Sequence, residues 1–500
     1  MSGPEARVVS APVVRSFPSV PLAAIADATG AEVIGDASTT AVADVSLDSR
    51  DLAPGSLFCC IAGARDDGHA HAPEAVANGA AALLVQRAVD VAVPQLRVRS
   101  VREAMGPAAA VVFGHPADAM TVVGVTGTNG KTTVTYLLEA IFRHADRRAG
   151  VIGTTGARVD GEAVMLELTT PEAPALHRLL ARMRDAGIDV VAMEISSHAL
   201  VQDRVGGLTV DVAVFTNLSQ DHLDFHGSMD AYFDAKAGLF VPSRARRGVI
   251  DVDDPWGRRL VDRAEIPVVT IALDADANVR ARDVVADARG VRFTVDGAEV
   301  RTPVLGRFNA ANALAALVAA REAGVDPRIA AEALGAVRGV PGRMEPVSAG
   351  QDFLVMVDYA HTPDSILGVL RAARPLMTGR VILVFGCGGD RDRAKRPAMG
   401  RIATANADLT VLTTDNPRSE DPLAIIAAAE SGAREGGGEY FVEPDRRLAI
   451  RRALAGASDG DVVVIAGKGH EPDQEIAGVR RPFDDRVVAR EELEARGTRR

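Results

Sequence analysis

The sequence predicts an α/β protein of three domains, and two observations lead to that prediction. The chain has 500 residues, too many for one hydrophobic core, so two to four domains are expected. From residue 118 onward, apolar strand-like runs alternate with helical stretches, which is typical of βαβ units and a mostly parallel sheet. This alternation restarts near residue 342. We therefore expect domains over residues 1–117, 118–341 and 342–500.

The composition limits the class of protein. Hydrophobic residues make up 47% and charged residues 25%, as in soluble globular proteins. Apolar runs stay shorter than a membrane span, and residues 1–7 lack a signal-peptide core, so we expect a cytoplasmic protein. Three cysteines, Cys59, Cys60 and Cys387, form neither a disulfide framework nor a metal cluster and predict buried thiols. A net charge of −11 argues against a general nucleic-acid binder but allows a small anionic substrate.

The N-terminal domain carries short apolar runs and one turn-rich segment over residues 48–58. It has no phosphate-binding loop. We expect a small α/β module.

The central domain opens with a glycine-rich run, Val-Gly-Val-Thr-Gly-Thr-Asn-Gly-Lys-Thr-Thr, at residues 123–133. Its glycines let backbone N–H groups converge on phosphate oxygens, its lysine adds a cation, and a threonine can hold Mg²⁺ at the start of the next helix. Val125 stands where the common form has glycine, so the loop is a variant. The alternative is a glycine turn with a solvated lysine. The predicted ligand is a nucleoside triphosphate, contacted by Gly127, Thr128, Asn129, Gly130, Lys131, Thr132 and Thr133.

The rest of the central domain supplies candidate metal ligands. Glu194 ends the apolar run Asp189–Met193, where phosphate-loop proteins place an acidic Mg²⁺ partner; the alternative is a carboxylate that caps the next turn. His222 and His226 have a zinc-like spacing, but Gly227 would end a helix there, so a phosphate or Mg²⁺ role for His222 fits better. Predicted elements here are strands Met120–Val125, Asp189–Met193, Val210–Phe215 and Gly248–Val252 and the helix Pro174–Ala186.

The C-terminal domain predicts a second, doubly wound sheet. Its strands are expected at Phe353–Val357, Val381–Phe385, Leu409–Thr413 and Val462–Ala466, with helices such as Asp364–Ala373 and Arg446–Ala455 between them. Each strand runs into a polar or glycine-rich turn. Because ligands of such sheets bind at the carboxyl ends of the strands, the four turns predict one site; they start at Asp358, Gly386, Thr414 and Gly467.

Taken in chain order, these motifs resemble the Mur ligase family, the ATP-dependent amide-forming enzymes of peptidoglycan precursor synthesis. Within the family they are similar to the members that add meso-diaminopimelate to UDP-N-acetylmuramoyl-L-alanyl-D-glutamate. The resemblance covers nearly the whole chain, from Asp48 to Arg418. It implies a UDP-binding N-terminal domain, a central ATP-binding domain and a C-terminal amino-acid-binding domain, with ATP and Mg²⁺ as cofactors and a monomer as the expected state.

The resemblance also implies site residues. Those for the UDP-muramoyl dipeptide are Ser49, Arg50, Thr169, Thr170, Ser196, Gln202 and Arg204. Those for ATP, beyond the loop itself, are Asn309, Asn312, Arg343, Asp358 and His361. Those for diaminopimelate are Asp415, Asn416 and Arg418, joined by Arg391, Gly467 and Glu471 as candidates for its carboxylates and distal ammonium. Catalytic or metal-binding roles fall to Lys131, Thr132, Glu194, His222 and Lys236.

Lys236 resembles the lysine that the family carbamylates with CO₂ to make a metal ligand. Carbamylation needs a neutral amine, whereas an ordinary lysine with a pKa of about 10.4 is charged at neutral pH. Burial would lower that pKa. Without the resemblance, Lys236 would be interpreted as a helix-surface lysine.

Three alternatives remain at this point. A lysine-adding Mur ligase or a folylpolyglutamate synthase-like ligase would share the phosphate loop, but the second would lack the Asp48-Ser-Arg50 segment and the Asp415-Asn-Pro-Arg418 turn. A nucleotide-gated binding module would need the loop alone. The Gly386-Cys-Gly-Gly turn lacks the third glycine of a dinucleotide-binding motif.

Overall fold

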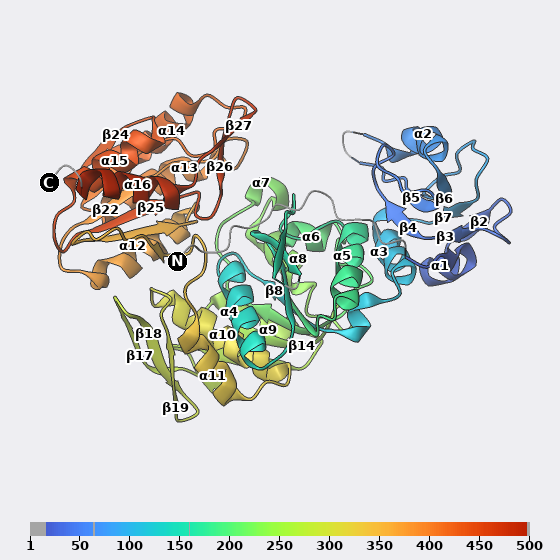
Figure 1. The fold of residues 1–500 in the computed structure, drawn as a ribbon, viewed down its shortest axis with the longest axis horizontal. Helices are drawn as coiled ribbons and strands as arrows, with labels where there is room; N and C mark the ends of the chain where they lie inside the picture. The colour runs from blue at the N-terminus through green and yellow to red at the C-terminus, as the bar shows by residue number, and fades with distance from the viewer. Residues whose placement is uncertain (1–16, 64–65, 160, 498–500) are drawn as a thin grey trace.

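The structure is a computed structural model that describes residues 17–63, 66–159 and 161–497. Residues 1–7, on which the signal-peptide expectation depends, lie outside this range. Figure 1 shows three α/β lobes in chain order, with the central lobe between the other two. The predicted fold class is confirmed, while the domain boundaries at 117/118 and 341/342 stay predictions.

The N-terminal lobe contains a five-stranded sheet in the order β2-β7-β6-β5-β4, in which β2 is antiparallel to β7 and the other pairs are parallel. Helices α1 and α3 bury their apolar faces against it. Its elements are β1 (Val20–Pro21), α1 (Leu22–Thr29), β2 (Glu32–Ile34), β3 (Ala41–Val42), β4 (Asp44–Ser46), β5 (Ser56–Cys59), α2 (Ala72–Ala77), β6 (Ala80–Val85), β7 (Gln95–Arg97) and α3 (Val101–Val112).

The central lobe is built on a nine-stranded sheet in the order β11-β10-β9-β12-β8-β13-β14-β15-β16. It is parallel except for the β9-β10-β11 edge. Its first part comprises β8 (Thr121–Thr126), α4 (Lys131–His144), β9 (Ala149–Gly153), β10 (Gly156–Val159), β11 (Glu162–Val164), α5 (Ala173–Asp185), β12 (Val190–Glu194), α6 (Ser197–Val201), β13 (Val210–Phe215), α7 (Leu223–His226) and α8 (Met229–Ala237). The predicted strands and the helix at Pro174 are present, with ends that shift by at most three residues.

The second part of the central lobe adds β14 (Ala245–Asp251), α9 (Pro255–Arg263), β15 (Val268–Ala272), β16 (Val279–Arg280), β17 (Arg282–Asp287), β18 (Gly290–Val295), β19 (Ala298–Thr302), α10 (Phe308–Glu322) and α11 (Pro327–Ala336). One core packs α4, α10 and α11 on one face of the large sheet, and a second core packs α5 and α8 on the other. Strands β17–β19 form a separate antiparallel sheet that the sequence analysis did not predict.

The C-terminal lobe contains a six-stranded sheet in the order β20-β21-β25-β22-β23-β24, parallel except for β20. Apolar cores lie on both of its faces, as a doubly wound fold requires. Its elements are β20 (Glu345–Pro346), β21 (Leu354–Asp358), α12 (Pro363–Ala373), β22 (Val381–Phe385), α13 (Lys395–Asn406), β23 (Leu409–Leu412), α14 (Pro422–Gly436), β24 (Tyr440–Val442), α15 (Arg446–Gly456), β25 (Val462–Ala466), β26 (Asp473–Ile476), β27 (Val479–Pro482) and α16 (Asp485–Gly497).

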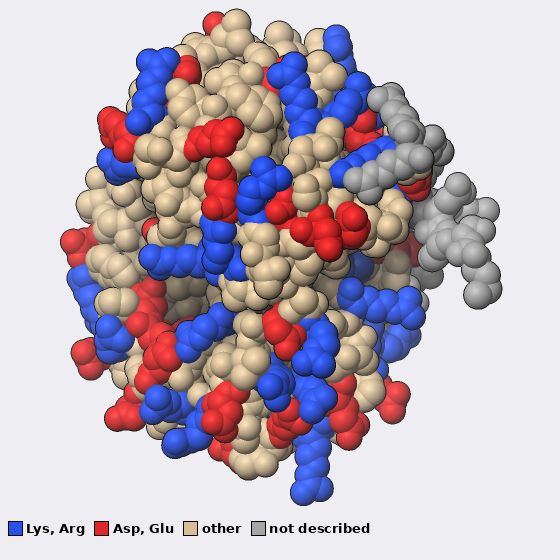
Figure 2. All heavy atoms as spheres, turned by 90° about the vertical axis from the view of Figure 1, so that its left-hand side faces the viewer, with Lys and Arg blue, Asp and Glu red and all other residues tan. Residues whose placement is uncertain are grey.

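The surface agrees with the composition. On the face shown in Figure 2, acidic and basic side chains are interspersed. All three cysteines are buried, as predicted. Among the described residues, no helix combines the length and apolar character needed to cross a membrane.

Candidate active site

The glycine-rich run forms the turn between β8 and α4. Lys131, the first residue of α4, folds back so that its ammonium donates to the carbonyls of Gly127 and Thr128, at 2.9 Å each. Gly130 has φ +90°, and a Cβ there would overlap the amide oxygen of Asn312. The glycines are therefore required by backbone angle and by space, and the loop leaves its N–H groups at the start of a helix, where anions bind.

Glu194 lies beside this loop at the end of β12. Its Oε1 accepts from the Thr132 hydroxyl at 3.0 Å and from the Thr154 N–H at 2.9 Å, and its Oε2 accepts from the Thr154 hydroxyl at 3.0 Å. The Thr154 hydroxyl also lies 3.2 Å from that of Thr169. A buried carboxylate thus faces a hydroxyl of the phosphate loop, which is the oxygen set that Mg²⁺ prefers.

The residues expected to contact the muramoyl dipeptide form a second cluster. Thr170 donates to the Glu194 carbonyl at 2.9 Å and accepts from the Ser196 N–H. Arg204 donates to the Thr170 carbonyl and to Gln202. Thr170 therefore contacts Glu194 directly, and the other three residues are connected to Glu194 through Thr170.

Two histidines and a carboxylate follow β13, and a third histidine, His198, lies beside them in α6. His222 packs edge-on against His198, and Asp221 is buried 3.4 Å from the His222 Nε2 atom. Burial lowers the pKa of His222 to about 3 and that of His226 to about 4. Both rings are therefore neutral near physiological pH and able to act as ligands. The described residues contain no group of three or more His, Cys, Asp or Glu side chains suited to a metal, which leaves the zinc alternative for His222 and His226 without support.

Lys236 is 1% exposed, so its interpretation as a helix-surface lysine is wrong. It projects from α8 into the centre of the site and donates to the Gly127 carbonyl at 2.8 Å, the same carbonyl that Lys131 contacts. Burial, together with the charge of Lys131, lowers the pKa of Lys236 well below its usual value.

The other ATP candidates approach the loop from two sides. Asn309 and Asn312 are buried at the start of α10, with Asn312 donating to Asn309. Arg343 crosses from the C-terminal lobe and donates to the Thr132 hydroxyl at 2.9 Å. Asp358 accepts from the N–H groups of Met344 and Ala360.

His361 follows Asp358 in the same turn. Its Nδ1 is bonded to the Tyr359 carbonyl at 2.8 Å, and burial lowers its pKa to about 4. Its ring is neutral near physiological pH for the same reason as that of His222.

The four strand-end turns of the C-terminal lobe come together as predicted. Asn416 donates to Glu471 Oε2 at 2.6 Å, and Arg418 donates to the Gly389 carbonyl at 2.7 Å. The Gly467 N–H donates to the Asp358 carbonyl, and a Cβ at Gly467 would overlap the Asp415 carboxylate.

Among the described residues, Arg418 forms no ion pair with Glu420 or Asp421, the neighbouring carboxylates that would hold it as a simple turn residue. Glu420 instead pairs with Arg396 at 2.8 Å and Arg393 at 3.1 Å. Arg418 has φ +53° and is partly buried, with its backbone bonded to Glu475 and Ala477. Its guanidinium therefore remains available at the edge of the turn.

Three residues expected to contact substrates stay outside these clusters. Ser49 donates to Glu74 at 2.5 Å and Arg50 pairs with Asp48 at 2.8 Å, so both bond within the N-terminal lobe. Arg391 is exposed and donates to the Asp390 carbonyl, although Gly388 lies against the side chains of Arg391 and Arg418.

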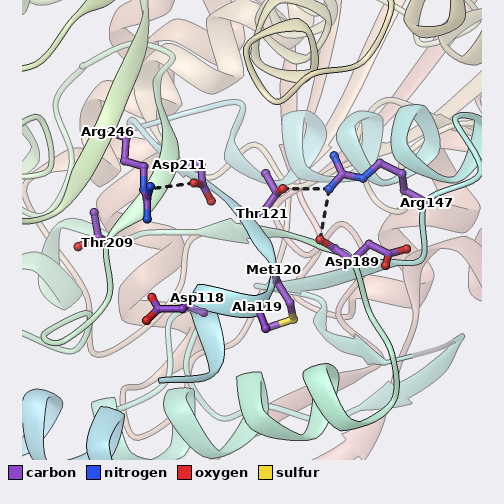
Figure 3. A pocket seen from close by; sticks show the side chains of 10 residues that line it. Asp118, Ala119, Met120, Thr121, Arg147, Asp189, Thr209, Asp211 and Arg246 are labelled. Atoms are coloured by element: carbon purple, nitrogen blue, oxygen red, sulfur yellow. Dashed lines mark hydrogen bonds and ion pairs between the residues drawn. The ribbon is translucent and has the colours of Figure 1, made fainter. Parts of the chain in front are cut away.

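A cleft of about 440 Å³ lies at the opposite edge of the central sheet (Figure 3). Here Arg147 donates to the Thr121 hydroxyl and the Asp189 carbonyl, and Arg246 lies 3.3 Å from Asp211. These residues sit where β8, β12 and β13 begin. Because ligands of open α/β sheets bind at the carboxyl ends of strands, we place no substrate in this cleft.

Sequence reasoning missed Thr154 and Asp221. Thr154 directly follows β9, and Asp221 precedes His222 in the turn after β13. The rule that applied to Glu194, polar residues after a buried strand, could have found both.

Together, a phosphate loop, a facing carboxylate and a second ligand-binding edge define a nucleotide-dependent enzyme of the phosphate-loop class. Comparison with known families narrows this class of enzyme to one family. Residues 41–149 match the Mur ligase family catalytic domain, residues 125–320 the Mur ligase middle domain, and residues 342–469 the glutamate ligase domain of Mur ligases. The chain belongs to the Mur ligase family, and it is an ATP-dependent ligase of peptidoglycan synthesis.

Individual relatives are similar to this chain over almost its full length. The UDP-N-acetylmuramoyl-L-alanyl-D-glutamate--2,6-diaminopimelate ligase of Streptomyces avermitilis is 47% identical over 95% of this chain and 97% of its own, and that of Gloeobacter violaceus is 47% identical over 92% and 95%. A solved structure of a ligase with this name covers 96% of the chain and 100% of its own, at 34% identity and a TM-score of 0.69. Folylpolyglutamate synthase of Mycobacterium tuberculosis shares the fold at 21% identity, over 72% of this chain and 91% of its own, with a TM-score of 0.60.

Proposed function

We propose that this ligase adds meso-2,6-diaminopimelate to the γ-carboxylate of D-glutamate in UDP-N-acetylmuramoyl-L-alanyl-D-glutamate. The observation that carries the proposal is at the carboxyl edge of the C-terminal sheet, where Asn416 bonds to Glu471 and Arg418, bonded to the Gly389 carbonyl, lies near enough for its charge to act on Glu471. This edge offers a guanidinium, an amide and a carboxylate, which match a substrate with a distal carboxylate and a distal ammonium. The names of the relatives support the same substrates.

The reaction requires activation of the acceptor. A carboxylate resists attack by an amine because its charge repels the nucleophile and oxide is a poor leaving group. The carboxylate attacks the γ-phosphorus of ATP, the bond to the bridging oxygen breaks, and ADP leaves an acyl phosphate behind. The neutral amine then attacks the acyl carbon and loses a proton, and phosphate leaves with the electrons of the C–O bond. Lys131 neutralises phosphoryl charge, and the convergence of the dipeptide cluster on Glu194 orients the acceptor beside the loop.

The residues around the loop fit Mg²⁺. Thr132 and Glu194 present a hydroxyl and a carboxylate 3.0 Å apart, and His222 is neutral. Mg²⁺ is usually held by one or two carboxylates together with substrate phosphates, so a larger protein cage is not needed. When bound, the ion supplies charge neutralisation for phosphoryl transfer.

Carbamylation of Lys236 is part of the proposal. Its low pKa gives a neutral amine, which can attack CO₂ and release a proton to form an N-carboxylate. Lys131, whose ammonium meets the same carbonyl, provides a neighbouring positive charge for the anionic product. The carbamate would join Thr132, Glu194 and His222 as the fourth metal-site residue.

The proposal also includes the division into domains, the location of the protein and its oligomeric state. We keep the division into 1–117 for UDP binding, 118–341 for ATP and 342–500 for the amino acid, with Ser49 and Arg50 contacting the UDP-muramoyl group. We propose a cytoplasmic monomer that acts on small molecules and not on nucleic acids. The mixed charge in Figure 2 supports the last point.

A product assay by mass spectrometry tests the proposal. The enzyme is incubated with the UDP-muramoyl dipeptide, ATP, Mg²⁺ and one of meso-diaminopimelate, L-lysine or L-glutamate. We expect the diaminopimelate adduct together with ADP and phosphate. A lysine adduct of equal yield would favour a lysine-adding ligase, γ-glutamylation of a folate would favour the folylpolyglutamate synthase alternative, and ATP binding without turnover would favour a binding module.

A further inference from the structure

Lysine is rare in this chain. The sequence has four lysines, Lys131, Lys236, Lys395 and Lys468, against 52 arginines. The basic side chains spread over the face in Figure 2 are therefore almost all arginines. Arginine is planar and forked, whereas lysine offers a compact ammonium with three donors. In a chain that uses arginine for nearly every cation, a lysine marks a place where the compact ammonium matters.

Three of the four lysines surround the phosphate site. Lys131 and Lys236 donate to the same Gly127 carbonyl, and Lys395 lies 3.8 Å from Asp221. Lys468 is different, because it lies in the turn after β25 of the C-terminal lobe, and it is 0% exposed.

The Lys468 ammonium has three oxygen partners. It donates to Asn416 Oδ1 at 3.5 Å, to Glu471 Oε2 at 3.4 Å and to the Asp473 carbonyl. An ammonium has three N–H groups, and this one has three acceptors, so each N–H group has a hydrogen-bond partner within the protein. Two of these partners, Asn416 and Glu471, belong to the proposed diaminopimelate site.

We propose that Lys468 is a positioning residue that sets affinity for the amino-acid substrate by locking Asn416 and Glu471 into one arrangement. The inference rests on the proposed function. Among the described residues, Asn416 and Lys468 both donate to the Oε2 atom of Glu471. The Oε1 atom is therefore left to accept from the distal ammonium of the substrate.

The electrostatics agree with this geometry. Burial and the neighbouring Asp415 raise the pKa of Glu471, while Lys468 and Arg418 oppose that rise. A protonated Glu471 would attract an ammonium less, so the buried lysine also maintains the charge that the substrate needs.

The test is Lys468→Met, which keeps the length of the side chain and removes its charge and donors. We expect the KM for meso-diaminopimelate to rise on the order of 10-fold to 100-fold, as misplaced binding groups commonly cause. The KM values for ATP and the UDP-muramoyl dipeptide should stay within about twofold, because the Lys468 ammonium bonds to none of the residues assigned to those two substrates. Equal rises in all three KM values, or an unchanged KM for diaminopimelate, would overturn the proposal.

Arg380→Met is the matched control. Arg380 ties Asp461 and the Gly456 carbonyl together at the amino end of the same strand β25, at 2.8 and 2.7 Å. The substitution removes a cation from the opposite edge of the same sheet. It should therefore leave the KM for diaminopimelate unchanged.

A second variant, Lys468→Gln, covers the case in which Lys468→Met fails to fold, since the amide keeps donors for Asn416 and Glu471. It should raise the same single KM by a smaller factor. In the double variant with Glu471→Gln, the two effects should be less than additive, and full additivity would contradict a shared role. If the wild type does not use diaminopimelate at all, the proposed function fails, whereas normal wild-type use with an unchanged KM in both Lys468 variants rejects this inference alone.

Discussion

At the scale of single residues, Lys236 shows how burial decides chemistry. Its ammonium is enclosed by α8 and the phosphate loop, so the folded protein favours the neutral amine. The direction of the pH dependence follows from the lowered pKa of Lys236. The neutral amine predominates above the folded-state pKa and is lost as the pH falls through it. Carbamylation, and the activity that depends on it, should therefore decline on the acid side.

Lys236→Ala should be nearly inactive and partly rescued by added formate or acetate, which can place a carboxylate where the carbamate oxygens would lie. Rates are measured with and without the added acid. The matched control is Lys131→Ala, which should lose on the order of 100-fold or more through the missing phosphate cation and gain nothing from the acids. Wild-type rates in Lys236→Ala would rule out the carbamate.

Arg418→Ala should raise the KM for diaminopimelate and remove most of the preference over L-lysine, which lacks the second carboxylate. A site of buried polar groups rejects such an analogue by on the order of 10⁴. Competition between the two amino acids measures the preference. Arg393→Ala, an exposed arginine that pairs with Glu420, is the control and should discriminate normally. A discriminating Arg418→Ala would contradict the role given to the turn.

Some of these residues could be predicted from the sequence, and others could not. Lys131, Glu194 and Arg418 could be predicted because each stands at the end of an apolar strand or in a recognisable turn. The burial of Lys236 and the three-way contact of Lys468 could not, since both depend on side chains that meet from distant elements. For Lys236, the resemblance to a family implies a carbamate, which stays a proposal.

At the scale of elements, the turns after the strands hold the site, and glycine sets their shape. Buried strands were predicted almost to the residue because their apolar runs are continuous, as in β22 and β25. The β17–β19 sheet was missed because charged residues interrupt its pattern; β17 in particular has no buried residue and is half exposed. Polar strands at a surface carry too weak a period to be separated from loops.

Gly130→Ala should damage the phosphate loop through a clash and not only through backbone strain. Its added Cβ would overlap the Asn312 amide, whereas Gly297→Ala, at φ +82°, meets open space. Both variants carry roughly 1–2 kcal/mol of left-handed strain, so their difference isolates the clash. We expect Gly130→Ala to lose ATP-dependent thermal stabilisation and Gly297→Ala to keep it. Equal ATP responses in the two would show that the space beside Asn312 is unimportant.

At the scale of the whole molecule, the C-terminal lobe contacts the central lobe in and beside the phosphate loop through Arg343 and Lys395. Arg343 donates to Thr132, and Lys395 lies 3.8 Å from Asp221. Burial raises the pKa of Asp221, but neighbouring groups, among them the Lys395 charge and the His222 backbone N–H, outweigh that effect, so the pKa is lowered and the carboxylate is ionised. Ion pairs between lobes are suited to controlling closure, which keeps water from an acyl phosphate.

Lys395→Ala should therefore uncouple the reaction. Without this contact the lobe that carries the amine closes less completely, water reaches the acyl phosphate, and phosphate is released without amide formation. We expect the ligation rate to fall by on the order of 10-fold to 100-fold, as loss of alignment typically does, and the ratio of phosphate to product to rise above one. Phosphate release and mass spectrometry of the product measure the two quantities. Arg401→Ala, an exposed change on the same helix α13 that removes only its pairing with Glu435, should retain a ratio of one. If Lys395→Ala also forms one amide for each phosphate at an unchanged rate, the contact with Asp221 does not control closure.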